Sequence, residues 1–347
     1  MEPKTFRLPK RIDSIQALRF LGAMCITVYH FTGIWGDCPF DFSHAVYLFY
    51  MISGFVVMLS TRSPDKKRFF LTRRLIRTLP LYWGLTVVTF AAGQFLPGVI
   101  GYKPTVWDLV RSMLFIPYSR ATAKAGSAIR PIVGLGHTLQ IEMLFYVCFL
   151  IAMRVRHKYR GPIAACFCVV FAVIGRWIPK RLAAPHFYTA NPWTWVSFLI
   201  GMGIYGLVAA AEKREIVVRK PKTAAMLTAA AAFGAAIPVF FVSLPVWYDV
   251  LMFALVLSAG LIWAVCGLKS PPALTYLGNM SFSYYLLHYY IVTLSARYFG
   301  IDSFSFRNIL LALLMSAAAW GVSWVSYKLI EEKTGGYLLS FLPDRKG

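Results

Sequence analysis

The sequence predicts an all-α fold: a polytopic integral membrane helical bundle of about ten transmembrane helices. Of the 347 residues, 58% are hydrophobic and only 14% are charged, whereas roughly 25% of the residues of a soluble domain are charged. The apolar residues occur in runs of about 20, the length that a helix needs to cross a bilayer core. The shorter dyad pattern of a membrane barrel is absent, so helices are the expected spanning elements.

The runs place the expected spans at residues 14–35, 43–61, 79–100, 136–153, 162–178, 191–211, 222–242, 245–266, 280–300 and 304–330. The first run is long enough to span the membrane, which favours a retained helix over a cleaved signal peptide. The one long connector is 101–135. No internal repeat and no second soluble domain is evident, so residues 1–347 are expected to form a single membrane domain.

The basic residues predict the orientation of the bundle. The formal charge is +22, from 36 Lys and Arg against 14 Asp and Glu. Such a balance is compatible with nucleic-acid binding, but these residues cluster between the apolar runs. With a cytoplasmic N-terminus, 24 of the 36 fall in inner segments and 9 in outer segments. This excess predicts that both termini are cytoplasmic and that 101–135 is the longest outer loop.

The six cysteines favour neither a disulfide framework nor a metal site. Most of them lie inside apolar runs and no CxxC pair is present. We therefore expect no bound metal.

Ionisable residues inside membrane helices are rare, and each is a candidate for function. Arg19 and His30 share the first span and are eleven residues apart, which brings them to within about 20° of the same helical face. The expected polar stripe leads from the cytoplasmic edge toward the outer third of the membrane. The structural alternative is that Arg19 reaches to the inner interface while His30 bonds a neighbouring helix.

Glu142 is the acidic residue that lies well inside a span. It is expected at a depth similar to that of His30, although contact between the two is an inference. A carboxylate beside an imidazole would fix its tautomer and raise its basicity. The alternative is a structural glutamate bonded to backbone or to a tyrosine. His288 also lies in mid-span, where packing and function are both open.

The segment 62–78 is the most basic of the inner segments. Alone, it is typical of an interfacial segment that enforces orientation. It also contains Arg73, Arg74 and Arg77, and the last two fall on one helical face at three-residue spacing. Guanidinium groups suit phosphate oxygens, so a phosphate-binding patch is the functional interpretation.

Five segments together resemble the acyltransferase family 3 membrane proteins. Arg19 and His30 match an Arg-x10-His motif, residues 49–55 (FYMISGF) an FF-x-x-SGF segment, and residues 70–83 a basic loop with RxxR. Residues 136–146 (GHTLQIEMLFY) match a WTL-x-x-E-x-x-FY helix, and residues 277–288 (LGNMSFSYYLLH) a segment that ends in YLxH. The first three are closest in wording to the exopolysaccharide acetyltransferase branch. His137 stands where the family usually has tryptophan, which puts the identity of the acceptor in question.

The resemblance implies a membrane O-acyltransferase in the bacterial inner membrane that modifies a polysaccharide. Acetyl-CoA or another acyl-CoA would be the cytoplasmic co-substrate, with no permanently bound cofactor, and a hydroxyl of a cell-surface or lipid-linked glycan would be the acceptor. We expect His30 as general base and Glu142 as the group that orients it. Donor or acceptor binding is expected of Arg19, Arg73, Arg74, Arg77, His137 and His288.

A transporter is the alternative from a different class. An anionic or lipid-linked solute could use Arg19, His30 and Glu142 as a relay, because intramembrane His and Glu suit both functions. The absence of an internal repeat and of matched broken helices argues against it, and the ordered set of five motifs favours the enzyme.

Overall fold

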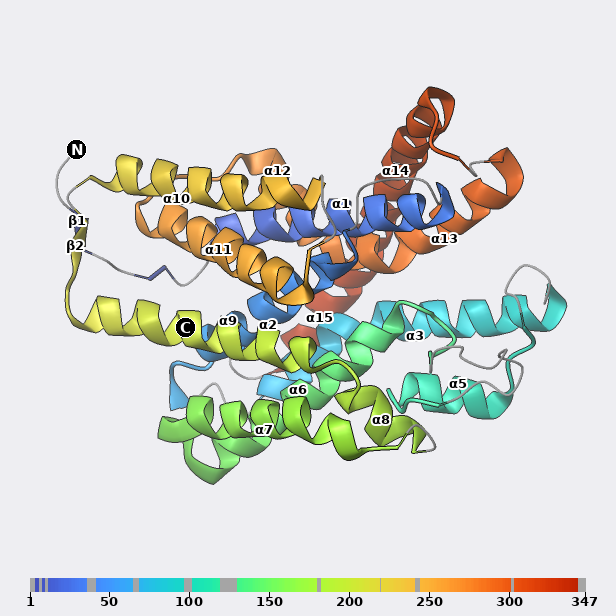
Figure 1. Ribbon diagram of the computed structural model, residues 1–347. Coiled ribbons are helices and arrows are strands. Elements are labelled where there is room, and N and C mark those ends of the chain that lie inside the picture. The colour runs from blue at the N-terminus through green and yellow to red at the C-terminus, as the bar shows by residue number, and fades with distance from the viewer. Residues whose placement is uncertain are drawn as a thin grey trace. The chain divides into compact units, whose positions relative to one another are not determined.

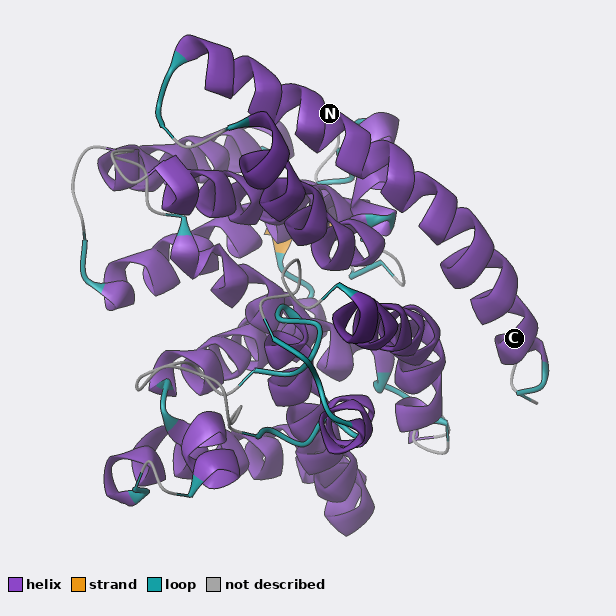
Figure 2. Cartoon of the chain, turned by 90° about the vertical axis from the view of Figure 1, so that its right-hand side faces the viewer, coloured by secondary structure: helices purple, strands orange, loops and turns teal. Residues whose placement is uncertain are grey.

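Helices make up nearly all of the structure (Figure 2). The computed structural model describes residues 4–5, 8–9, 12–35, 42–64, 69–96, 102–118, 130–179, 182–218, 220–240, 244–300 and 303–342. Across these ranges the one strand pairing is antiparallel, between β1 (Lys4–Thr5) and β2 (Val217–Val218). The predicted helical class is therefore confirmed.

The expected number of about ten spans is not confirmed. Over the described residues, seven helical stretches are long and apolar enough to cross a membrane. One of them, Gly136–Trp177, has 42 residues and holds two expected spans, α6 (Gly136–Arg156) and α7 (Arg160–Ile174), which pack on each other. Two expected spans fall short: α10 (Pro221–Ala236) has 16 residues, and α13 (Ser281–Phe299) is rich in Tyr and Ser.

The chain divides into two compact units. The first comprises Met1–Ser60 with Trp193–Val322, and the second Thr61–Pro192 with Ser323–Gly347. The prediction of a single membrane domain over 1–347 stays a prediction.

The first unit is built around α1 (Asp13–Trp35). Besides α10, α13 and the strands, its elements are η1 (Ser43–Ala45), α2 (Val46–Ser60), α9 (Pro192–Lys213, from Trp193), η5 (Ile237–Phe240), α11 (Val246–Val265), α12 (Pro272–Asn279) and α14 (Phe306–Ser326, to Val322). In Figure 1, α1 runs beside α11 and α12, and it also packs against α13 and α2. A Cβ at Gly278 of α12 would overlap the backbone of Gln16, and Ser14 Oγ donates to the Gly260 carbonyl of α11 (2.6 Å). Small residues of the neighbouring helices therefore pack closely against the N-terminal half of α1.

Small residues also set the contact between α2 and α9. A Cβ at Gly54 would overlap the backbone of Phe198, and a Cβ at Gly201 would overlap the backbone of Met51. Each helix thus presents a glycine to the main chain of the other. Gly54, in the FYMISGF segment, is therefore a packing residue.

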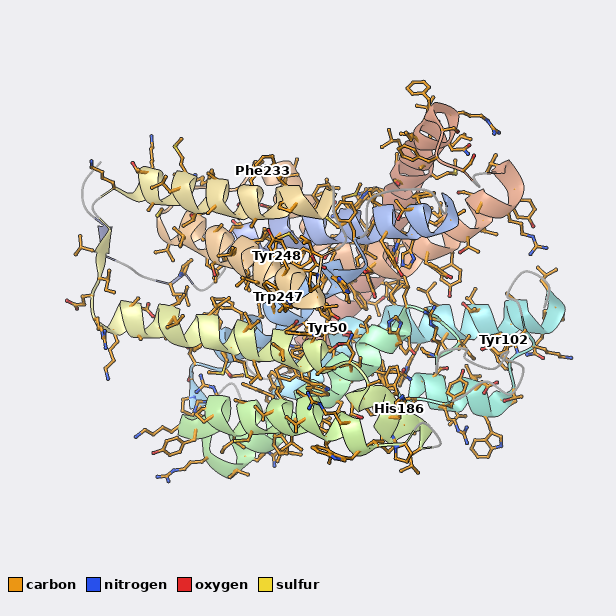
Figure 3. The ribbon with its side chains drawn as sticks, viewed as in Figure 1. Tyr50, Tyr102, His186, Phe233, Trp247 and Tyr248 are labelled. Atoms are coloured by element: carbon orange, nitrogen blue, oxygen red, sulfur yellow. The ribbon has the colours of Figure 1, made fainter. Side chains whose placement is uncertain are left out.

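The aromatic side chains of α10 and α11 show which faces of these helices pack together and which are exposed. Tyr248 of α11 donates from its hydroxyl to the Ala235 carbonyl of α10 (3.0 Å), whereas Trp247 and Phe233 are exposed (Figure 3). Large exposed apolar side chains recur on α3 (Phe70–Phe95), α7 and α14. Such extensive apolar surface suits a bilayer as the solvent.

The second unit corrects two expectations. Its further elements are α3 (Phe70–Phe95), α5 (Val106–Met113), η3 (His157–Tyr159), η4 (Gly175–Trp177), α8 (Ala183–Thr189), η6 (Tyr327–Thr334, a π-helix) and α15 (Gly335–Ser340). Residues 70–78 belong to α3 and not to a loop, because the helix begins nine residues before the expected start of the span and continues through Pro80. The connector 101–135 contains α5, which a capping box of Thr105 and Asp108 begins.

Candidate active site

His30 lies among aromatic and histidine rings of the first unit. Its ring centre is 5.3 Å from that of His288, 5.0 Å from that of Tyr289 and 5.1 Å from that of its neighbour Tyr29. We call His30, His288, Tyr284 and Tyr289 the histidine cluster. It forms because α13 packs along α1. His30 is partly exposed and His288 is fully buried.

Tyr284 anchors the buried side of the histidine cluster. Its ring stacks on Trp320 of α14 with ring centres 3.8 Å apart, and its hydroxyl accepts a hydrogen bond from Thr27 of α1 (2.9 Å). It also stacks on His288, with an interplanar angle of 14°. Tyr284 is fully buried together with Ala23 and Ala319 in one apolar core. Three helices therefore determine where the two histidine rings lie.

Arg19 lies eleven residues before His30 on the same helix. It is partly buried, and its Nη1 donates to Gln16 Oε1 at 3.5 Å. The polar contacts expected at the inner end of α1 are thus present between Gln16 and Arg19.

Glu142 lies in the second unit, where it bonds to a tyrosine one turn along α6. The Tyr146 hydroxyl donates to Glu142 Oε1 (2.5 Å), and Arg74 Nη1 of α3 donates to the same hydroxyl oxygen (3.3 Å). The guanidinium of Arg74 is also 5.0 Å from the centre of the Tyr146 ring and 5.9 Å from that of Phe70. We call Arg74, Tyr146, Glu142 and Phe70 the arginine–tyrosine cluster. It links a guanidinium group to a carboxyl group through a buried phenol.

The other arginines of α3 differ in exposure. Arg73 is partly buried, as Arg74 is, whereas Arg77 is exposed. Arg74 and Arg77 both lie on α3, as their spacing required, but Arg74 is already engaged with aromatic rings. Arg77 therefore offers the more accessible guanidinium for a phosphate.

His137 lies at the first turn of α6. Its Nδ1 is 2.9 Å from the Gly134 carbonyl, which can only accept, so Nδ1 carries the proton. The preceding Gly136 packs against the ring of Tyr82 so closely that an added Cβ would overlap it.

The structure thus brings together His30 with His288, and Arg74 with Glu142. The expected pairing of His30 with Glu142 stays a prediction, because the two residues belong to different units. Sequence reasoning missed Tyr146 as the link to Glu142, although its position four residues after Glu142 is the spacing at which helical side chains meet.

The sequence analysis also missed a histidine–carboxylate pair in the first unit. His44 of η1 bonds to Asp249 of α11 through Nδ1, and Asp249 is buried. Only the fold shows that the start of α11 packs against η1.

Within the described residues, no three His, Cys, Asp or Glu side chains are grouped so that they could hold a metal ion.

Comparison with known proteins identifies the family. The chain is 27% identical over 342 residues to "Acyltransferase MdmB" of Streptomyces mycarofaciens, which covers 86% of this chain and 83% of that protein. It is 29% identical over 133 residues to "Exopolysaccharide production protein ExoZ" of Rhizobium meliloti (strain 1021), over 37% of this chain and 40% of that protein. No solved structure matches significantly.

The long apolar helices and the acyltransferase relative together indicate a membrane protein of the acyltransferase class. The family model described as an acyltransferase domain, Acyl_transf_3, matches residues 12–328. The chain belongs to this family, acyltransferase family 3, as the five sequence segments indicated.

Proposed function

We propose that this membrane acyltransferase transfers an acetyl or other acyl group from cytoplasmic acyl-CoA to a hydroxyl of a cell-surface or lipid-linked glycan, such as an exopolysaccharide, in the bacterial inner membrane. The observation that carries the proposal is the partly exposed His30 within the histidine cluster of a membrane helix. The similarity to ExoZ, an exopolysaccharide production protein, supports a polysaccharide acceptor.

A neutral imidazole is the group that acyl transfer to a sugar requires. A hydroxyl is a weak nucleophile and must lose its proton as it attacks the thioester carbonyl. His30 accepts that proton, the hydroxyl oxygen forms the new ester bond, and the carbon–sulfur bond breaks. The departing thiolate of CoA then takes the proton from His30, so the histidine returns to its neutral state.

The arginines of α3 supply the proposed donor site. CoA carries phosphates, and guanidinium groups bind phosphate oxygens through paired hydrogen bonds. Arg77 is exposed and Arg73 and Arg74 are partly buried, so the start of α3 offers both a first contact and a more enclosed one. The excess of Lys and Arg in the expected inner segments supports a cytoplasmic donor.

Membrane vesicles with radiolabelled acetyl-CoA and endogenous glycan provide the test. The wild-type protein should leave label on the glycan. His30→Gln and His30→Asn keep hydrogen-bonding capacity but cannot act as a base near neutral pH, so both should lower transfer by roughly a hundredfold or more. Protein level in the membrane and binding of acyl-CoA should remain close to wild type.

Three results would contradict the proposal. Near-normal acetylation by either His30 variant would remove His30 as the base. Label that enters the vesicles without joining a glycan would favour the transporter. Label on a lipid or small molecule would overturn the glycan acceptor while leaving the acyltransferase in place.

A further inference from the structure

His288 has a buried nitrogen that the fold leaves without a partner. Its Nδ1 is 3.0 Å from the carbonyl oxygen of Tyr284. A carbonyl oxygen only accepts, so Nδ1 carries the proton of the neutral ring and Nε2 carries a lone pair. Nε2 is buried and has no hydrogen-bond partner among the residues that the structure describes. Buried polar atoms are nearly always hydrogen-bonded, so this atom points to an interaction that forms during function.

His30 lies close to His288, and its ring can donate a proton in a hydrogen bond. With a nitrogen–nitrogen distance of about 2.9 Å, two hydrogen-bonded imidazoles have ring centres roughly 5 Å apart. The ring centres of His30 and His288 are 5.3 Å apart, with an angle of 42° between the planes. The separation of the two rings is therefore close to that of a hydrogen-bonded pair of imidazoles.

The His288 ring itself is held in place. Tyr284 stacks on one side of it, and Tyr284 is fixed in turn by Trp320 and Thr27. The Nδ1 bond to the backbone fixes which nitrogen is protonated. His288 therefore presents a preorganised acceptor to the partly exposed ring of His30.

We propose that His288 is the positioning residue for His30, and that its Nε2 accepts a hydrogen bond from the His30 ring as that ring takes up the proton of the acceptor hydroxyl. This inference rests on the proposed role of His30 as base. A neutral acceptor stabilises the imidazolium without placing a second ionised group in the apolar core, where an ion is costly. His288 would thus do in the first unit what a carboxylate does for the histidine of a catalytic triad.

Three substitutions at one position separate this role from packing. His288→Asn keeps a donor for the Tyr284 carbonyl but has no acceptor at the position of Nε2. His288→Gln places an amide at about the position of Nε2 and restores the acceptor. His288→Phe keeps the ring shape and removes both polar atoms. A role in packing alone ranks Phe as the best substitute, whereas positioning of His30 ranks Gln as the best.

Two readouts are needed, and one of them is independent of acyl transfer. The first is kcat and KM for both substrates. The second is the rate at which diethyl pyrocarbonate modifies His30, measured by mass spectrometry, with His186 of the second unit as internal reference. An acceptor on one ring nitrogen makes the other nitrogen a better nucleophile, so loss of the acceptor should slow this modification.

The Asn and Phe variants should lower kcat by roughly tenfold to a hundredfold, with KM for both substrates within about threefold. Both should also slow the modification of His30, and Gln should recover most of each loss. Unchanged modification of His30 in Asn and Phe would overturn the inference, and so would Phe performing as well as Gln. Slower modification in Glu142→Gln but in no His288 variant would assign the role to Glu142 instead.

Failure of the proposed function gives a different pattern. If His30 is not the base, His30→Gln still transfers acetyl, whereas the His288 variants still change the reactivity of His30. The two rings would then be in contact, but the contact would not serve acyl transfer. This result would contradict the role of His288 as a positioning residue for the reaction.

Discussion

Tyr146 donates a hydrogen bond to Glu142 from one helical turn away on α6, at 2.5 Å. The same hydroxyl accepts a hydrogen bond from Arg74, so one phenol oxygen contacts both a carboxyl group and a guanidinium group. Glu142 therefore has a polar partner within its own unit, which is the structural role that the sequence left open for it. A catalytic role for Glu142 remains compatible with this bond and is testable through Tyr146.

Tyr146→Phe removes the hydroxyl and keeps the ring under Arg74. A hydrogen bond to a charged group is worth roughly 1.5–3 kcal/mol. If the carboxylate of Glu142 takes part in transfer, kcat should fall by about tenfold or more. Acyl-CoA binding should change less, because the stacking of Arg74 persists. Tyr159→Phe is a matched control, since Tyr159 also lies under a cation, Arg156, but outside the cluster. Equal rates for the two variants would leave Glu142 a structural residue.

Arg77→Ala and Arg74→Ala should both weaken binding of acyl-CoA, by roughly tenfold or more each, because charge-assisted bonds to phosphate are lost. Lysine should rescue Arg77 better than Arg74. Arg77 is exposed and acts through its charge, whereas Arg74 also stacks on Phe70 and Tyr146. Equilibrium binding of labelled acyl-CoA to the purified protein measures this. Arg154→Ala, an exposed arginine near the end of α6, removes the same charge and should have little effect. Unaltered affinity in both alanine variants would exclude this donor site.

Gly201→Ala should destabilise the protein, whereas Gly203→Ala in the same helix should not. An added methyl at Gly201 overlaps the backbone of Met51, and overpacking of this kind costs about 1–3 kcal/mol. A methyl at Gly203 meets nothing within 4 Å, and alanine is preferred to glycine in a helix by up to about 1 kcal/mol. Thermal melting of the two variants in one detergent gives the comparison. A lower melting temperature for Gly203→Ala than for Gly201→Ala would contradict the close contact of α2 with α9.

Cysteines introduced as probes test the orientation. Lys66→Cys and Glu215→Cys should be shielded from an impermeant thiol reagent in intact cells, and Lys124→Cys should react, all in a protein without Cys38. The reason is the excess of Lys and Arg in the segments assigned to the cytoplasm. The reverse labelling pattern would place the arginines of α3 outside, away from acyl-CoA.

Apolar runs and motifs predicted the helical class and the family, because each run and each motif is made of residues that are close in sequence. The sequence analysis placed the start of this span at residue 79, because residues 62–78 are strongly basic. An apolar run marks the part of a helix that lies in the membrane core, whereas the helix itself extends further, to Phe70. The spacing of Thr105 and Asp108 is that of a capping box, so the sequence contained a signal for the start of α5 within the long connector.

The side-chain partners were harder to predict than the helices. His30 and His288 are 258 positions apart, and nothing local indicates that α13 lies along α1. The same is true of His44 and Asp249, which only the packing of η1 against α11 joins. Glu142 and Tyr146 are the exception, since their spacing of four residues on one helix was sufficient to predict contact.

The π-helical stretch Tyr327–Thr334 has a consequence for the evolution of the family. The wider hydrogen-bond spacing of a π-turn accommodates an extra residue without unwinding the helix. Gain or loss of one residue there would turn the following α15, which packs on α3, by about 100°. The family match ends at residue 328, inside this stretch. The matched region therefore ends where the helix changes its winding, and a relative that gained or lost one residue there would turn a different face of α15 toward α3.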